Sequence, residues 1–299
     1  MKIKTIIEKI KASYKGDGID NARTRDQILY GTVDSECTGI VTTIWANVEV
    51  IKKAHSLGAN LIICHEALFW NHGDHQDWFS DNQIATFLEK KKLLDDYGIT
   101  VWRCHDYIHS GMLVGNHYVD GIFYGLAKKL GWEDYMINDI SDPLLFELPK
   151  TTAEQLSYTL ISKLKLNGVR IIGDRNTTIK RLKIPSFHIF GDANEDIRQI
   201  EQEDFDAILP LEMVDYSLAE YIKDASLLGK NKVSLSIGHF NMEEPGMEMM
   251  VDYLLKVLGK DIPVTFIQAG DTYDYIVKET FYIKSQEEIL KNKKTPSLR

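Results

Sequence analysis

The sequence predicts an α/β protein built from two α/β domains. Its 299 residues correspond to about two domains of roughly 150 residues each. Short runs rich in β-branched residues alternate with segments of helical periodicity, which is the order of elements in a parallel sheet covered by helices. The composition is that of an ordinary globular protein, with 44% hydrophobic and 26% charged residues. Disorder is therefore expected only near the ends of the chain.

The first half of the chain has the pattern of a βαβ unit followed by further alternating elements. The first helix is amphipathic because its isoleucines recur at helical spacing. The second helix ends at a glycine, which is a common stop signal. In order, we expect a helix within 1–18, a strand at 37–46, a helix at 48–58, a strand at 60–64, a helix at 82–97, a strand at 99–104 and a helix at 118–130.

The pattern restarts after a boundary that we place near residues 126–145. A strand at 144–149 precedes a helix that begins at a threonine, with Glu154 placed as in a capping box. We expect further strands at 169–173, 180–190, 206–211, 232–238 and 262–268, helices at 212–228 and 245–258, and a frayed tail at 284–299. The predicted domains are residues 1–125, completed by the C-terminal segment 239–299, and residues 126–238.

Charge and composition argue against several classes of partner. The chain has 35 Lys and Arg residues against 44 Asp and Glu residues, a net charge of −9, so it has no overall attraction for nucleic acid or anionic lipid. No run approaches the ~18 consecutive apolar residues of a membrane span. The cysteines Cys37, Cys64 and Cys104 are odd in number and lack CxxC spacing, which is typical of reduced thiols. We expect a cytoplasmic protein that binds neither nucleic acid nor a membrane.

Histidines and acidic residues follow three predicted strands. His65 and Glu66 follow the strand at 60–64, His105 and His109 follow the strand at 99–104, and His239 and Glu243 follow the strand at 232–238. In open α/β sheets ligands bind in the crevice beyond the carboxyl ends of the strands. The three segments therefore predict one shared site.

Imidazole and carboxylate groups together suit zinc, iron, manganese or nickel. Two metal ions could be held, because carboxylates offset the charge of paired ions and bridge them. The alternative interpretation is that each strand-end histidine is only hydrogen-bonded within the fold. The residues alone leave both interpretations open.

Four segments carry a resemblance to a known family: GANLIICHEALFW, the HxxxH of CHDYIHSG, GLAKKLGW and GHFNMEEPGMEMM. In order and spacing they resemble the Nif-three-like family, also known as the GTP cyclohydrolase one type two homologues, across roughly residues 30–270. The resemblance implies two α/β domains with a dinuclear metal centre in the crevice between them. It also implies a ring-shaped homo-hexamer.

The family's metal pattern is a His-His pair, an HxxxD segment and a GHxxxE segment. Glu66 stands where the second histidine is expected and His109 stands where the aspartate is expected. The two exchanges leave the totals unchanged, at three imidazoles and two carboxylates. The resemblance thus implies a rearranged site, with these metal ligands: His65, Glu66, His109, His239 and Glu243.

Other residues near this site have weaker signals. His105 could transfer a proton, and Asp106 could orient an imidazole. Cys64 and Cys104 each precede a site histidine, so strand alternation predicts that they face the core. The aromatic segment at 69–79 is interpreted as a loop anchored by its aromatic side chains, or alternatively as a lid over the site, and Glu212 could face a substrate.

The expected function is a metal-dependent hydrolase that uses a metal-activated water on a small-molecule substrate, with two divalent ions as cofactors and His105 as the proton-transfer residue. The cyclohydrolase name implies a nucleotide substrate, although the sequence has no GxGxxG after a strand and no GxxxxGK[ST] motif. The alternative is a ring protein that stores, delivers or senses metal, or binds partners, without catalysis. Neither the substrate nor the identity of the metal follows from the sequence.

Overall fold

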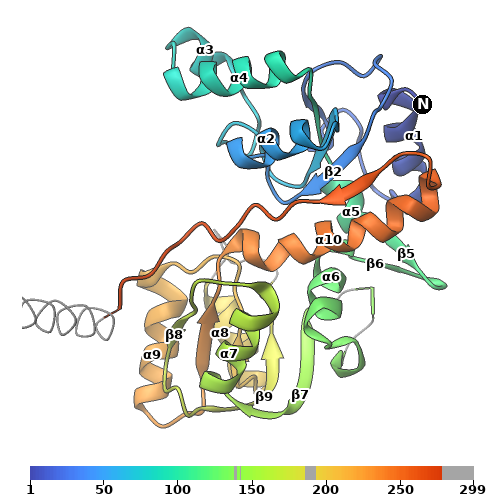
Figure 1. Cartoon of the computed structure of the whole chain (residues 1–299). Helices are drawn as coiled ribbons and strands as arrows, with labels where there is room; N and C mark the ends of the chain where they lie inside the picture. The colour runs from blue at the N-terminus through green and yellow to red at the C-terminus, as the bar shows by residue number, and fades with distance from the viewer. Residues whose placement is uncertain (138–139, 142, 186–192, 278–299) are drawn as a thin grey trace, which may run out of the picture.

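The protein has a mixed α/β fold with two five-stranded sheets and a two-stranded hairpin (Figure 1). The computed structural model describes residues 1–137, 140–141, 143–185 and 193–277. The predicted tail at 284–299 and the end of the strand predicted at 180–190 lie outside these residues. The division into domains at residues 126 and 238 stays a prediction.

The first sheet is parallel except for its edge strand β1, which is antiparallel to β4. All residues of β2, β3 and β4 are buried, as expected for a parallel sheet covered on both faces. In spatial order its strands are β1 (Ile28–Tyr30), β4 (Thr100–Arg103), β3 (Leu61–Cys64), β2 (Ile40–Thr43) and β12 (Val264–Phe266).

Helices cover both faces of this sheet. Alternate strand residues belong to two hydrophobic clusters: Ile40 and Ile63 lie in one, and Val41 and Ile62 lie in the other. The first cluster contains α1 (Ile3–Ser13) and most of α10 (His239–Leu258), and the second contains α2 (Val48–Ser56) and α4 (Ala85–Tyr97). The predicted amphipathic first helix is confirmed.

The second sheet has a parallel centre with an antiparallel strand at each edge. Its strands, in spatial order, are β7 (Leu145–Thr152), β9 (Thr178–Lys183), β10 (Ala207–Ile208), β11 (Val233–Ser236) and β8 (Arg170–Ile172). Helices α6 (Gly121–Leu130) and α7 (Ala153–Leu164) pack on one face, and α8 (Ala193–Gln202) and α9 (Glu220–Leu227) pack on the other.

Helix α10 joins the two sheets, and Figure 1 shows it running between them. Met242, near its start, belongs to the core of the second sheet, whereas Met247 and Met250 belong to the core of the first. It also crosses α6 very closely, because a Cβ built on Gly125 would lie 2.5 Å from the Cα of Gly246. The start of α10 is thereby fixed between the two sheets.

Several local predictions differ from the structure. The helix predicted at 245–258 begins at His239, because Pro245 lies inside the helix instead of at its start. The capping box of α7 uses Thr152 and Gln155, so Glu154 is not its acidic member. The helix predicted at 118–130 begins only at Gly121, and the segment predicted at 212–228 forms a π-helical turn, η2 (Asp215–Ala219), before α9.

Seven further elements were not predicted: β1, α8, α3 (Asp77–Asp81), α5 (Asp106–Ser110), the two strands of the hairpin, β5 (Met112–Val114) and β6 (His117–Val119), and the 3-10 helix η1 (Glu133–Tyr135). They are short or weakly patterned, except α8. A membrane-spanning helix is not found among the described residues, since none is long and apolar enough.

We predict that Gly125→Ala lowers the free energy of unfolding by about 1–3 kcal/mol, because the new methyl group overlaps the backbone of α10. The higher helix propensity of alanine would by itself stabilise the protein by up to about 1 kcal/mol. A net loss of stability would therefore come from the overlap where α6 crosses α10. Lys128→Ala, on the exposed side of the same helix, should change stability by less than about 0.5 kcal/mol. Urea unfolding measures both variants, and an unchanged Gly125→Ala protein would contradict the prediction.

Candidate metal centre

Three strand ends bring the predicted site residues together. His65 and Glu66 follow β3, where both backbone N–H groups donate to the Ile44 carbonyl at 3.1 and 2.8 Å. His105 follows β4 and precedes α5, which carries His109. Beyond β11, Gly238 adopts a positive φ of 90° that turns the chain into α10.

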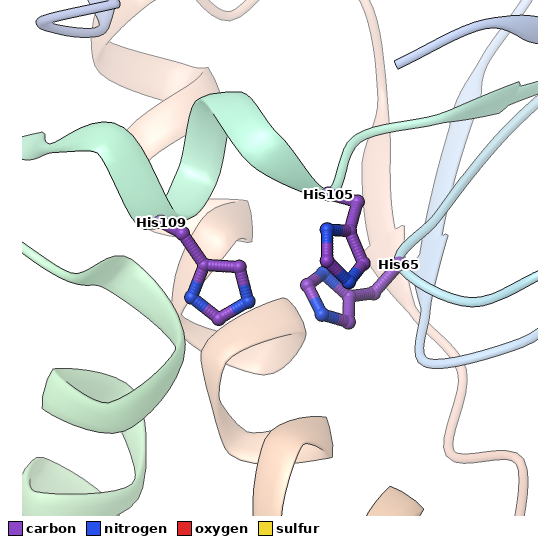
Figure 2. Close-up of side chains that lie close together, drawn as sticks. All are labelled: His65, His105 and His109. Atoms are coloured by element: carbon purple, nitrogen blue, oxygen red, sulfur yellow. The ribbon is translucent and has the colours of Figure 1, made fainter. Parts of the chain in front are cut away.

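His65, His105 and His109 form the first cluster of potential ligands (Figure 2). One side-chain nitrogen from each residue lies within 4.8 Å of the others. The rings of His65 and His105 stack with centroids 4.4 Å apart, and His109 approaches His65 edge-on at 5.0 Å. The structure thus brings together residues that are 44 positions apart in sequence (109 − 65 = 44).

A second group consists of His65, Glu66 and Glu243, again with ligand atoms within 4.8 Å. Glu243 Oε2 lies 3.5 Å from His65 Nε2 and 3.2 Å from His239 Nε2. His239 Nε2 is also 3.6 Å from Glu66 Oε1. All six residues that the sequence predicted therefore lie in one connected set.

Two atoms at the centre of this set are buried and without hydrogen bonds in the described part of the chain: His65 Nε2 and Glu243 Oε2. His65 is fully buried, and burial lowers its pKa well below the usual range, so its ring is neutral. A buried polar atom without a hydrogen bond costs about 1–3 kcal/mol, and the His239 imidazole 3.2 Å from Glu243 Oε2 offsets part of this cost for the carboxylate. A divalent cation would satisfy both atoms, so the residues present fit such an ion.

In all four imidazoles an oxygen atom lies next to Nδ1. His65 Nδ1 is 3.2 Å from the Cys104 carbonyl oxygen, and His105 Nδ1 is 2.9 Å from Asp106 Oδ1. The same arrangement recurs at His109 with Asp120 Oδ2, at 2.8 Å, and at His239 with Glu212 Oε1, at 3.2 Å.

This pattern has a direct chemical consequence. An oxygen acceptor at Nδ1 holds the hydrogen there and leaves the Nε2 lone pair available, which is the usual arrangement of metal-binding histidines. Asp106 was a candidate for such a contact in the sequence, whereas Glu212 was expected to face a substrate and Asp120 was missed. Its only sequence signal is its place before a helix, where its other oxygen caps Ile122 and Phe123 of α6.

Arg103 is a second residue that sequence reasoning missed. It is the one charged side chain of the fully buried strand β4, and that position is its only sequence signal. Its guanidinium lies 3.2 Å from Glu66 Oε2 and 3.0 Å from Asp74 Oδ2, and its Nε donates to the His65 carbonyl at 2.9 Å. Arg103 therefore fixes both the Glu66 carboxylate and the loop that follows.

Carboxylates control the charge of two partly exposed histidines, His109 and His239. Burial lowers the pKa of His109, but Asp120 and Glu243 outweigh it and raise this pKa to about 9. Burial also lowers the pKa of His239, but the carboxylates of Glu212 and Glu243 raise it to about 10. The site therefore attracts positive charge, and a metal would compete with these protons.

Both cysteines face the cores, as predicted. Cys64 lies in the cluster with α2 and α4, and Cys104 lies in the opposite cluster with α1 and α10. The segment at 69–79 is anchored by Phe69, which is fully buried, while Trp70 and Trp78 are exposed. Anchoring is confirmed for Phe69, and a lid role for the exposed tryptophans stays a prediction.

A model of the DUF34/NIF3 (NGG1p interacting factor 3) family matches residues 1–94 and 101–272. The chain belongs to the DUF34/NIF3 family. The resemblance drawn from the histidine segments is thereby confirmed. A search of curated proteins gives no match.

Solved structures of family members have the same fold. The chain is 18% identical to the hypothetical protein SA1388 of Staphylococcus aureus, with a TM-score of 0.67 over 92% of this chain and 99% of that one. A Bacillus cereus protein related to NIF3 has 14% identity and a TM-score of 0.64, over 92% and 99% of the two chains. Reduced HcgD from Methanocaldococcus jannaschii has 16% identity and a TM-score of 0.55, over 89% and 97%. At these identities the likeness shows the fold alone.

We predict that Asp120→Asn lowers the pKa of His109 by about one to three units in chelator-treated protein, because the charge beside Nδ1 is lost while asparagine still caps α6. In wild type, the folded pKa of about 9 exceeds the unfolded value near 6.5, so the stabilisation is complete below pH 6.5 and is lost as the pH rises to 9. In Asp120→Asn the free energy of unfolding should fall less as the pH rises over this range.

Histidine NMR titration and urea unfolding at several pH values measure the two effects. Asp134→Asn, an exposed acidic residue elsewhere on the surface, is the control and should leave both unchanged. An unaltered His109 midpoint in Asp120→Asn would show that Asp120 does not set this pKa.

Proposed function

We propose that this protein is a dinuclear divalent-metal hydrolase acting on a small molecule. The observation that carries the proposal is the pair of ligand groups that meet at two buried atoms without hydrogen bonds, His65 Nε2 and Glu243 Oε2. Buried nitrogen and oxygen atoms of this kind are satisfied when their lone pairs coordinate a cation. The family resemblance and the histidine Nδ1 contacts support the same conclusion.

The number of available donor atoms supports two ions. His65 has only Nε2 free, so it can bind one ion, whereas a carboxylate has two oxygens and can bridge. If two ions bind, His65, His109 and Glu243 would hold one, and Glu66, His239 and Glu243 would hold the other. Three protein ligands per ion leave a coordination position for water or substrate, as catalytic sites require.

His105 is assigned to proton transfer. Its Nδ1 is held by Asp106, so its Nε2 is directed toward the cluster in which its ring stacks on His65. That hydrogen bond to His105 also holds the pKa of Asp106 well below its usual range, so Asp106 stays ionised. When bound, divalent metals lower the pKa of coordinated water and polarise an oxygen of the substrate. His105 then supplies the proton for the leaving group.

We predict that protein purified without chelator contains about two metal ions per chain, and that His239→Ala lowers this to about one or none. The reason is that His239 is the only imidazole assigned to its ion. Plasma emission spectrometry measures the content, and His117→Ala, an exposed histidine on β6, is the matched control. A wild-type content near zero would contradict the dinuclear assignment and leave partner binding as the alternative.

We predict that metal-loaded protein hydrolyses at least one compound in a panel of phosphoesters, nucleotides and cyclic amides. His105→Gln should lower kcat by about 10²- to 10⁴-fold because it removes the proton donor, with metal content unchanged. Steady-state kinetics with metal analysis of the same sample separates the two effects. If fully metallated wild type turns over nothing in the panel, the protein is instead a metal-storage, delivery or regulatory protein.

A further inference from the structure

A pocket lies beside His239, on the side of the second sheet. It has a volume of about 140 Å³, and its lining includes Arg170, Ser236, His239, Phe240, Thr272 and Tyr273. A cavity of about this volume holds one six-membered ring or a comparable group. Because the pocket shares His239 with the candidate metal centre, a molecule that reacts at the metals can extend one small group into it.

Arg170 gives this pocket its charge. The side chain is exposed at the start of β8, and its Nη2 donates to Ser236 Oγ at 3.3 Å. Within the described residues it makes no ion pair with a carboxylate. Glu212 also lines the pocket, but its Oε1 accepts from His239 Nδ1. The guanidinium is therefore a cation available to a ligand, in a chain whose net charge is −9.

Asp271 holds the segment that brings Thr272 and Tyr273 to the pocket. Its Oδ1 accepts from Asn241 Nδ2 and from the Tyr273 N–H, both at 3.1 Å, and its Oδ2 accepts from the Asn167 N–H at 2.9 Å. One carboxylate thus ties the segment that carries Thr272 and Tyr273 to α10 and to the loop before β8. The lining of the pocket therefore combines hydroxyl and aromatic groups with a guanidinium.

We infer that this pocket binds an oxyanion of the substrate, either a phosphate or a carboxylate, through Arg170. A guanidinium matches both groups because its N–H donors can bind two oxygens at once. The hydroxyl groups of Ser236 and Thr272 can donate to the remaining oxygens, and the rings of Phe240 and Tyr273 can contact a planar carbon skeleton. This inference rests on the proposed function, since it names the class of substrate for the same site.

The test measures the binding of phenyl phosphate, benzoate and the neutral analogue benzyl alcohol by isothermal titration calorimetry to metal-loaded protein. The two anions represent the two sources of the oxyanion, and the tighter one identifies the natural group. Arg170→Met should weaken the binding of the preferred anion by about 10- to 100-fold and leave benzyl alcohol unchanged. Arg175→Met, at an exposed arginine 3.8 Å from Glu154 and outside the pocket, is the matched control and should bind like wild type.

Metal content is measured on every sample, so the two proposals can fail separately. If Arg170→Met binds both anions as tightly as wild type, or if wild type binds neither, the inference about the pocket is overturned even when two metals are present. If the anions bind but only removal of the metals abolishes binding, they bind to the ions and not to Arg170. A metal content near zero overturns the proposed function, while the Arg170 comparison still decides whether the pocket takes an anion.

Discussion

The close crossing of α6 and α10 is the constraint on which the site depends. Gly125 and Gly246 let the two backbones approach, because a side chain at either position would overlap the other helix. Helix α10 carries His239 and Glu243 in its first turns, and Asp120, which holds His109, is the residue that caps α6. The distance between the helices therefore sets the position of His109 relative to Glu243, although these residues lie on different segments. A change at this crossing would move ligands that it does not touch.

Opposite charges accompany the two residues that depart from the family's metal pattern. Glu66, an acid in place of a histidine, lies 3.2 Å from the buried guanidinium of Arg103, and His109, a base in place of an aspartate, lies 2.8 Å from Asp120. A buried arginine is stable only when its N–H donors are satisfied. Arg103 donates to the backbone carbonyl oxygens of His65 and His72 and also pairs with the Asp74 carboxylate. Each of the two exchanged residues, Glu66 and His109, thus has a partner of opposite charge that is not itself a candidate metal ligand. This balance favours a rearranged site over a lost one.

Much of the fold, and the residues that meet in the candidate site, could be predicted from the sequence, because both depend on local patterns. Buried parallel strands appear as short apolar runs, and a ligand at a strand end is visible as His65 directly after Cys64. The partners of these ligands could not be predicted, because Asp120 and Arg103 contact residues 11 and 37 positions away. The start of α10 was predicted six residues too late, because a proline usually marks the beginning of a helix, whereas Pro245 lies inside α10.

The contacts of Glu66 make the two ions of the proposed centre unlike. Oε2 of Glu66 faces Arg103, so only Oε1, which is 3.6 Å from His239 Nε2, is directed toward the ligands. In the proposed assignment one ion has two imidazoles and a shared carboxylate, while the other has one imidazole and two carboxylates, one of them bound through a single oxygen. Imidazole-rich sites suit zinc, iron or nickel, and carboxylate-rich sites suit manganese or other hard ions. In the proposed centre, an ion held by His239 would lie beside the Arg170 pocket and would meet the substrate oxygens, while the imidazole-rich ion would lie next to His105. The two exchanges would then separate the tasks of the two ions: one would orient the anionic substrate, and the other would act where the proton is transferred.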